Sequence, residues 1–219
     1  MDPVATRMRE LYDRRAADYV ATTGEVGLFP GLDAELARFV QRMPGGGPVL
    51  DLGSGVGRDA DWFSRRGLSV VAVDFSEQML RITGARSPEV AVVQAELTNL
   101  PFRDDRFAGA WVCASLVHLA SAGHPRALAE VFRTLQPSGA VAISMKVGHG
   151  EGWATGSKLP DERWFSYVDA DEFAGLMRAV GFVGVTTIPS GRDTWFIAEG
   201  IKPGRLGSTR PDDSSGGFA

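Results

Sequence analysis

Apolar residues recur along the first part of the chain at the spacing of amphipathic helices. They are three or four positions apart in residues 3–22, and the same pattern returns in residues 31–43. The run Pro44-Gly45-Gly46-Gly47-Pro48 ends the second pattern, because proline and consecutive glycines interrupt a helix. We therefore expect two N-terminal helices, followed by a different kind of structure.

From Val49 onward, short continuous apolar runs alternate with segments of helical spacing. This pattern is typical of a parallel sheet whose strands are buried by helices on both faces. A short link near the C-terminus joins two further strands and is short enough for an antiparallel hairpin. The predicted strands are 49–52, 69–73, 90–94, 107–114, 139–146, 182–188 and 193–199, and the later predicted helices are 58–66, 76–84, 125–135 and 170–180.

The predicted fold class is α/β: a doubly wound, Rossmann-like, mostly parallel seven-stranded sheet with an antiparallel C-terminal hairpin. We expect three parts, namely an N-terminal cap of helices over 1–43, the main domain over 44–202 and a disordered tail over 203–219. The tail is expected to be disordered because Pro, Gly and Ser occupy nine of its 17 positions.

Composition narrows the class further. The hydrophobic share of 44% and the charged share of 23% are those of a globular protein, and the net charge of −4 gives no general attraction to nucleic acid or anionic membranes. There is no apolar run of about 20 residues and no signal-peptide pattern, so a cytoplasmic location is expected. The single Cys113 excludes an internal disulfide, and no His, Asp or Glu grouping has the spacing of metal ligands. A monomer or a homodimer is expected.

Glycine is in excess, with 27 residues, and six of them fall in residues 45–57. The segment Asp51-Leu52-Gly53-Ser54-Gly55-Val56-Gly57 ends the first predicted strand and begins a helix. Glycines there allow a tight turn and a close approach of a ligand to the main chain, while helix N–H groups face a negative ligand group. The alternative is a plain tight turn without a ligand.

Asp74 ends the second predicted strand, whose carboxyl end adjoins the glycine loop in a doubly wound sheet. Its carboxylate can accept hydrogen bonds from a ribose diol, or it can cap the following helix. A dinucleotide-binding loop has a small residue three positions after its second glycine, where this chain has the bulky Arg58.

An acid before the glycine loop, together with Asp74, resembles the class I S-adenosylmethionine-dependent methyltransferases of the bacterial small-molecule type. The similarity extends from about Tyr12 to Lys202. Glu96-Leu97-Thr98-Asn99-Leu100-Pro101-Phe102 resembles the family's adenine-binding segment, and Tyr12-Asp13-x-x-Ala16-x-x-Tyr19 resembles its lid helix. The resemblance implies S-adenosylmethionine as the cofactor, and it implies cofactor contacts from Tyr19, Asp51, Gly53, Ser54, Gly55, Arg58, Asp74, Phe75, Glu96, Leu97 and Ala114.

Methyl transfer from a sulfonium mainly requires in-line positioning, and a base is needed only if the acceptor must lose a proton. His118, just after the fourth predicted strand, is the first candidate base, although a capping or packing role is the alternative. His124 is expected to be exposed at the start of a helix. A second glycine cluster, Lys146-Val147-Gly148-His149-Gly150-Glu151-Gly152-Trp153, follows the fifth predicted strand. It resembles a Val-Lys-x-Gly-x-Gly-Glu loop of a bacterial subgroup and adds His149 as a second catalytic candidate.

Residues near that cluster are candidates for binding the acceptor, with Arg163 suited to a carboxylate or phosphate. The alternative is a surface loop with packed aromatic side chains. The candidate substrate-binding residues are Tyr12, His149, Glu151, Trp153, Arg163 and Trp164.

The predicted function is transfer of a methyl group to O, N or C of a small-molecule acceptor. Two alternatives stay open: an NAD-type oxidoreductase on a similar sheet, and a cofactor-binding protein of this fold without methyl transfer.

Overall fold

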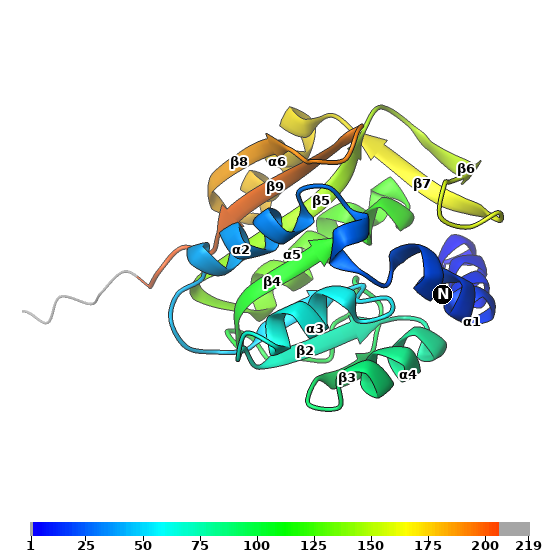
Figure 1. Cartoon of the computed structure of the whole chain (residues 1–219). Helices are drawn as coiled ribbons and strands as arrows, with labels where there is room; N and C mark the ends of the chain where they lie inside the picture. Colours follow the sequence, from blue (N-terminus) through cyan, green and yellow to red (C-terminus); the bar gives the residue numbers. More distant parts are fainter. Residues whose placement is uncertain (1, 206–219) are drawn as a thin grey trace, which may run out of the picture.

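The computed structural model describes residues 2–205 of the chain (Figure 1). Its helices and strands follow the order that the sequence predicts, with one additional pair of strands. The helical elements are α1 (Pro3–Thr23), η1 (Val26–Leu28), α2 (Leu32–Arg42), α3 (Arg58–Ser64), α4 (Glu77–Arg86), η2 (Leu116–His118), η3 (Ser121–Gly123), α5 (His124–Thr134) and α6 (Ala170–Val180). The strands are β1 (Val49–Leu52), β2 (Val70–Asp74), β3 (Ala91–Gln94), β4 (Phe107–Cys113), β5 (Leu135–Val147), β6 (Glu151–Thr155), β7 (Glu162–Val168), β8 (Val183–Pro189) and β9 (Trp195–Ile201).

The strands form one mostly parallel sheet in the order β3-β2-β1-β4-β5-β7-β6, with β9 pairing antiparallel to β5 and to β8. The predicted fold class is therefore confirmed, including the antiparallel pair at the C-terminus. The hairpin of β6 and β7 enlarges the predicted seven-stranded sheet to nine strands within residues 2–205.

Side chains of the central strands alternate between two apolar cores, one on each face of the sheet. In β1, Leu50 and Leu52 belong to the core covered by α5 and α6, whereas Val49 belongs to the core covered by α2 and α3. Figure 1 shows α2 and α3 on the near face of the sheet. The continuous apolar runs in the sequence reflect this burial on both faces.

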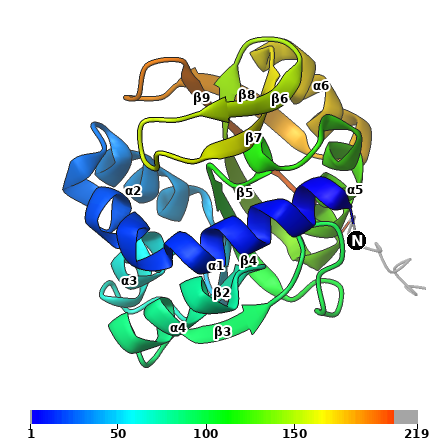
Figure 2. The same ribbon diagram turned by 90° about the vertical axis from the view of Figure 1, so that its right-hand side faces the viewer.

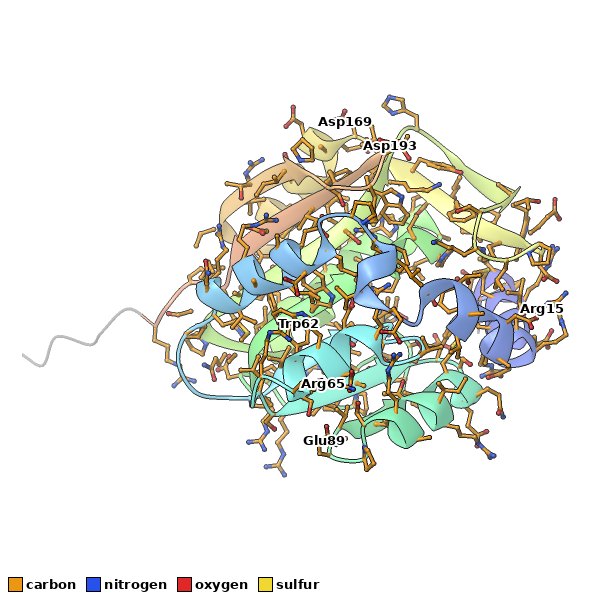
Figure 3. The ribbon with its side chains drawn as sticks, viewed as in Figure 1. Arg15, Trp62, Arg65, Glu89, Asp169 and Asp193 are labelled. Carbon is orange, nitrogen blue, oxygen red and sulfur yellow. The ribbon has the colours of Figure 1, made fainter. Side chains whose placement is uncertain are left out.

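Helix α1 crosses the end of the sheet at which the parallel strands finish, between α4 and the β6–β7 hairpin (Figure 2). Asp13 fastens it to the first turn of α4, because its Oδ1 accepts hydrogen bonds from Ser76 Oγ at 2.7 Å and from Gln78 N at 3.2 Å. On the other side, Arg15 lies on the outer surface of α1 (Figure 3), and its Nε donates a hydrogen bond of 2.8 Å to Asp161 Oδ2. The helix therefore lies over the sheet as a cap.

The hairpin β6–β7 extends the sheet beyond β4. β4 pairs with β5 as far as Cys113 opposite Ser144, and β7 then pairs with the same edge of β5, with Tyr167 opposite Lys146. This register carries the hairpin past the ends of the central strands and toward α1.

The prediction that His124 is exposed is wrong. The residue is 2% exposed, because its Nε2 lies 3.2 Å from the carbonyl oxygen of Leu116 and 3.1 Å from Ser166 Oγ. Residues 206–219, which hold most of the predicted disordered tail, lie outside the described residues. Within 2–205, no helix has the length and apolar character needed to cross a membrane.

Candidate active site

A cavity of about 500 Å³ lies beneath α1, where the parallel strands end. Many of the candidate residues line it, although they come from widely separated parts of the sequence. The predicted cofactor-binding residues in the lining are Tyr19, Gly53, Ser54, Gly55, Arg58, Asp74, Phe75, Glu96, Leu97 and Ala114, and the other candidates there are Tyr12, His118 and Arg163.

The glycines of the loop serve two purposes: one allows close packing within the protein, and another leaves space for a ligand. Gly53, Gly55 and Gly57 all have positive φ values, of +74°, +54° and +75°. A Cβ on Gly53 would overlap Ser115, so that glycine is needed for packing within the protein. A Cβ on Gly55 would meet only Tyr19 at 3.7 Å and would otherwise occupy the cavity. Gly55 thus leaves room for a ligand.

Asp74 lies at the end of β2 and contacts this loop directly. Its Oδ2 accepts a hydrogen bond from Gly55 N and its Oδ1 one from Ser76 N, both at 2.9 Å. Each carboxylate oxygen has further lone pairs. Burial raises the pKa of Asp74 to about 6, against the opposing effect of the backbone N–H groups. Ser76 is the residue that caps α4, through Met79 N, which leaves Asp74 available to a ligand.

Polar groups without partners also surround the cavity. Within residues 2–205 the buried Ser54 Oγ has no hydrogen-bond partner.

The backbone of Ala114, directly after β4, is also unusual. Its φ is +54°, and its N–H donates a 2.8 Å hydrogen bond to Ser144 Oγ. A backbone held in this strained region marks a place where the fold constrains the chain closely. These features fit a nucleoside-type ligand that supplies hydroxyl and amino groups.

Asp51 does not line the cavity but lies buried beneath the loop. Burial and the nearby Asp59 carboxylate raise its pKa. Arg58 faces the cavity and pairs with Asp59 through two hydrogen bonds, of 2.6 and 2.8 Å. Asp59 in turn accepts a hydrogen bond from Trp111 Nε1 at 2.8 Å, which joins α3 to β4. Asp51 is therefore not placed to contact a ligand in the cavity directly.

A chain of hydrogen bonds joins the cap to the sheet. His118 Nδ1 lies 2.7 Å from the carbonyl oxygen of Trp164, so this nitrogen carries the proton and donates. His118 Nε2 then accepts from the Tyr12 hydroxyl at 2.9 Å. Burial lowers the pKa of His118 to about 3 and raises that of Tyr12. His118 is therefore a neutral acceptor in the ligand-free protein.

The β6–β7 hairpin removes four of the acceptor candidates from the cavity lining. His149 is exposed in the turn between β5 and β6, because the strand pairing directs this turn away from the cavity. Glu151 accepts a hydrogen bond from Ser121 N at 2.6 Å, near the surface. Trp153 and Trp164 pack edge to face under α1, with ring centroids 5.7 Å apart. These tryptophans support the cap.

Several lining residues were not among the candidate site residues. Lys146 lies next to the end of β5 and Phe165 lies on β7, while Arg192 comes from the β8–β9 link and Trp195 begins β9. The antiparallel pairing of β9 with β5, with Trp195 opposite Lys146, brings that link to the cavity. The position of this link depends on the register between β9 and β5, which the local sequence does not indicate.

Comparison with known proteins places this geometry in a class. Residues 49–139, less than half of the chain, match the family model described as "Methyltransferase domain". A demethylmenaquinone methyltransferase of Paenarthrobacter aurescens is 35% identical over 100 residues, which cover 45% of this chain and 38% of that protein. The chain thus spans well under half the length of this curated relative.

The fold of this chain is also similar to those of solved structures. A Burkholderia thailandensis 1,6-didemethyltoxoflavin-N1-methyltransferase with bound S-adenosylhomocysteine is 25% identical, with a TM-score of 0.60, over 78% of this chain and 76% of that one. The [4+2]-cyclase SpnF is 18% identical, with a TM-score of 0.68, over 90% and 95% of the two chains.

The resemblance seen in the sequence is therefore confirmed. Residues 49–139 match the methyltransferase-domain model, and the chain has the Rossmann-like fold of S-adenosylmethionine-dependent methyltransferases of known structure.

Replacing Gly55 by Ala tests whether the open glycine makes room for the cofactor. The added methyl group occupies the cavity, so we expect at least about tenfold weaker binding of S-adenosylhomocysteine by calorimetry. A left-handed Ala costs about 1–2 kcal/mol of stability. Gly67→Ala is the matched control, because Gly67 has a φ of +79°, no atom within 4 Å of its Cβ position and no place in the lining. Equal affinities in the two variants would contradict this assignment.

The raised pKa of Asp74 predicts a pH dependence of both stability and binding. The folded state holds this proton more tightly than the unfolded chain, so Asp74 makes the ligand-free protein less stable as pH rises from about 4 through about 6. Protonation turns one carboxyl oxygen into a donor and removes the negative charge that strengthens hydrogen bonds from hydroxyls, so affinity for S-adenosylhomocysteine should rise through about pH 6. In Asp74→Asn, affinity should fall about tenfold or more at neutral pH and lose this dependence. If the affinity of the wild type for S-adenosylhomocysteine is constant from pH 5 to 8, this role of Asp74 is refuted.

Proposed function

We propose that this protein transfers the methyl group of S-adenosylmethionine to O, N or C of a small-molecule acceptor. The observation that carries the proposal is the pairing of the Asp74 carboxylate with the open Gly55 on the floor of a capped cavity. This arrangement suits a ribose diol beside a group that passes close to the main chain. When bound, the cofactor supplies a methyl group already activated by its positive sulfur.

The remaining residues of the cofactor half have roles that follow from their positions in the lining. We propose that the oxygens of Asp74 accept the ribose hydroxyls. Glu96 and the Leu97 N–H are assigned to the adenine edge, at the end of the cavity that follows β3. Tyr19, which extends from α1 toward Gly55, covers the ligand from above.

The N-terminal cap, residues 1–43, excludes water in this proposal. The buried residues of α1 pack against the sheet end, and Tyr12 and Tyr19 meet edge to face with ring centroids 5.5 Å apart. Exclusion of water keeps an acceptor in line with the methyl group and strengthens the electrostatic interactions in the site. Residues 44–202 then form the domain that binds both ligands.

A general base at His118 stays a prediction, and its surroundings favour the neutral ring. Its unprotonated nitrogen, Nε2, already accepts a hydrogen bond from the Tyr12 hydroxyl, and its lowered pKa makes it a weak base. We propose that His118 acts first as a positioning residue that holds Tyr12 and α1 in place. No step then requires His149, which is exposed.

The test begins with binding and ends with transfer. The full chain should bind S-adenosylhomocysteine in preference to NAD⁺ by at least about a hundredfold in calorimetry. With methyl-labelled S-adenosylmethionine and a bacterial metabolite extract, it should produce a labelled small molecule, and Asp74→Asn should slow this reaction. Preference for NAD⁺ would overturn the proposal in favour of an oxidoreductase. Tight binding without a labelled product across extracts would favour a cofactor-binding protein that does not transfer methyl groups.

A further inference from the structure

Among residues 2–205, three cationic side chains of the lining have no carboxylate partner. One of them, Lys158, donates to the carbonyl oxygen of Thr22 at 3.3 Å, which leaves Lys146 and Arg163. Arg163 is 4% exposed, its Nε has no hydrogen-bond partner, and no ion pair to it is found within residues 2–205. Lys146 is half-buried and likewise forms no ion pair or hydrogen bond in the described part of the chain. Both residues line the cavity. A buried charge is costly unless it is paired, so two such charges together point to a missing anion.

The other arginines of the lining differ in this respect. Arg58 is bound by Asp59, and Arg192 lies 3.8 Å from a carboxylate oxygen of Glu35. Asp193, in the β8–β9 link (Figure 3), is exposed and forms no ion pair of 4 Å or less with Lys146 or Arg163. The fold therefore pairs two of its cavity-facing arginines and leaves Lys146 and Arg163 for something else.

The two cations share one aromatic surface. The Phe165 ring centroid lies 4.9 Å from Lys146 Nζ and 5.1 Å from Arg163 Cζ. Lys146 Nζ is also 5.7 Å from the ring centroids of Tyr167 and Trp195. Burial, and then repulsion by Arg163, lower the pKa of Lys146, which shows that the two charges act on each other. This part of the cavity thus combines positive charge with flat apolar walls.

Resting on the methyl transfer proposed above, we propose that the acceptor carries an oxyanion on a planar ring, such as an aromatic carboxylate or phenolate, bound between Lys146 and Arg163. A guanidinium and an ammonium donate charge-assisted hydrogen bonds to such oxygens. The aromatic rings of Phe165, Tyr167 and Trp195 contact the planar body.

The position of the two cations separates them from the cofactor half. Gly55, Asp74 and Glu96 follow β1, β2 and β3, on one side of β4 in the sheet. Lys146 lies next to the end of β5, on the other side of β4, and Arg163 lies on β7, which pairs with β5 beyond the end of β4. An anion held there lies across the cavity from the ribose and adenine contacts, where an acceptor must approach the methyl group.

This assignment also explains how a nucleophile can form without a base. Two neighbouring positive charges lower the pKa of a bound hydroxyl or carboxyl group, so its proton leaves to solvent on binding. A lone pair of the acceptor then forms the bond to the methyl carbon, and the electron pair of the breaking carbon–sulfur bond stays on sulfur. A neutral His118 is consistent with this sequence of events.

The experiment compares matched anionic and neutral ligands on the full chain saturated with S-adenosylhomocysteine. The probes are benzoate against benzamide and 2-naphthoate against 2-naphthamide, with dissociation constants measured by calorimetry. We expect each anion, or at least the better-fitting naphthoate, to bind about tenfold or more tightly than its amide. Lys146→Met and Arg163→Met should reduce this preference to about threefold or less, whereas Lys146→Arg retains it. No preference for either anion in the wild type would overturn the inference, whatever the variants do.

S-adenosylhomocysteine affinity is measured in the same series and keeps the two proposals apart. Unchanged affinity in Lys146→Met and Arg163→Met is expected. If the affinity for S-adenosylhomocysteine falls about tenfold in both variants, the two cations bind the carboxylate of the cofactor, and the acceptor assignment is overturned. If the wild type itself fails to bind S-adenosylhomocysteine, the proposed function fails before the acceptor is considered.

Discussion

The hydrogen-bonded chain from Tyr12 through His118 to the Trp164 carbonyl holds the site together. It links three parts of the fold that the sheet alone does not join: the N-terminal helix, the segment after β4 and the β6–β7 hairpin. The apolar residues of α1 pack against the end of the sheet, and Asp13 and Arg15 fasten the helix at its two sides. Because α1 is the roof of the cavity, these hydrogen bonds help to enclose the ligands.

Beneath that roof the charges are divided between the ends of β1, β2 and β3 and the part of the cavity formed by β5 and β7. One side offers the carboxylate of Asp74 and the open backbone of the glycine loop, which suit hydroxyl and amino groups. The other side offers the cations Lys146 and Arg163 over the Phe165 ring. A doubly wound sheet brings different loops to the same end of its strands, and the cap then makes one cavity of them. The fold alone does not fix the chemistry, as a structurally similar protein named as a cyclase illustrates.

Features that depend on local pattern and on the topology of a parallel sheet could be predicted from the sequence. Asp74 and the Gly53–Gly57 loop follow adjacent buried strands, so their proximity is a consequence of the fold class. The β6–β7 hairpin was not predicted, because Gly148, Gly150 and Gly152 indicate a loop and β6 is not buried. Its strands are stabilised by contacts with β5 and α1 that are distant in sequence.

The acceptor half was the less predictable part for the same reason. His149 is three residues from Lys146 in sequence, yet only Lys146 lines the cavity, since the turn after β5 directs the chain outward. Arg163 reaches the cavity through the register of β7 on β5, which no local pattern encodes. His124 was expected in water because it begins a helix, but Ser166 of the unpredicted hairpin covers it.

A crystal structure of the chain with S-adenosylhomocysteine would show both halves of the cavity at once. We expect the ribose hydroxyls on the Asp74 carboxylate, the backbone of Gly55 against the ligand, and the sulfur facing the side of the cavity that holds Lys146 and Arg163. A ligand bound outside the cavity, or one whose carboxylate lies between those two cations with its ribose away from Asp74, would contradict it.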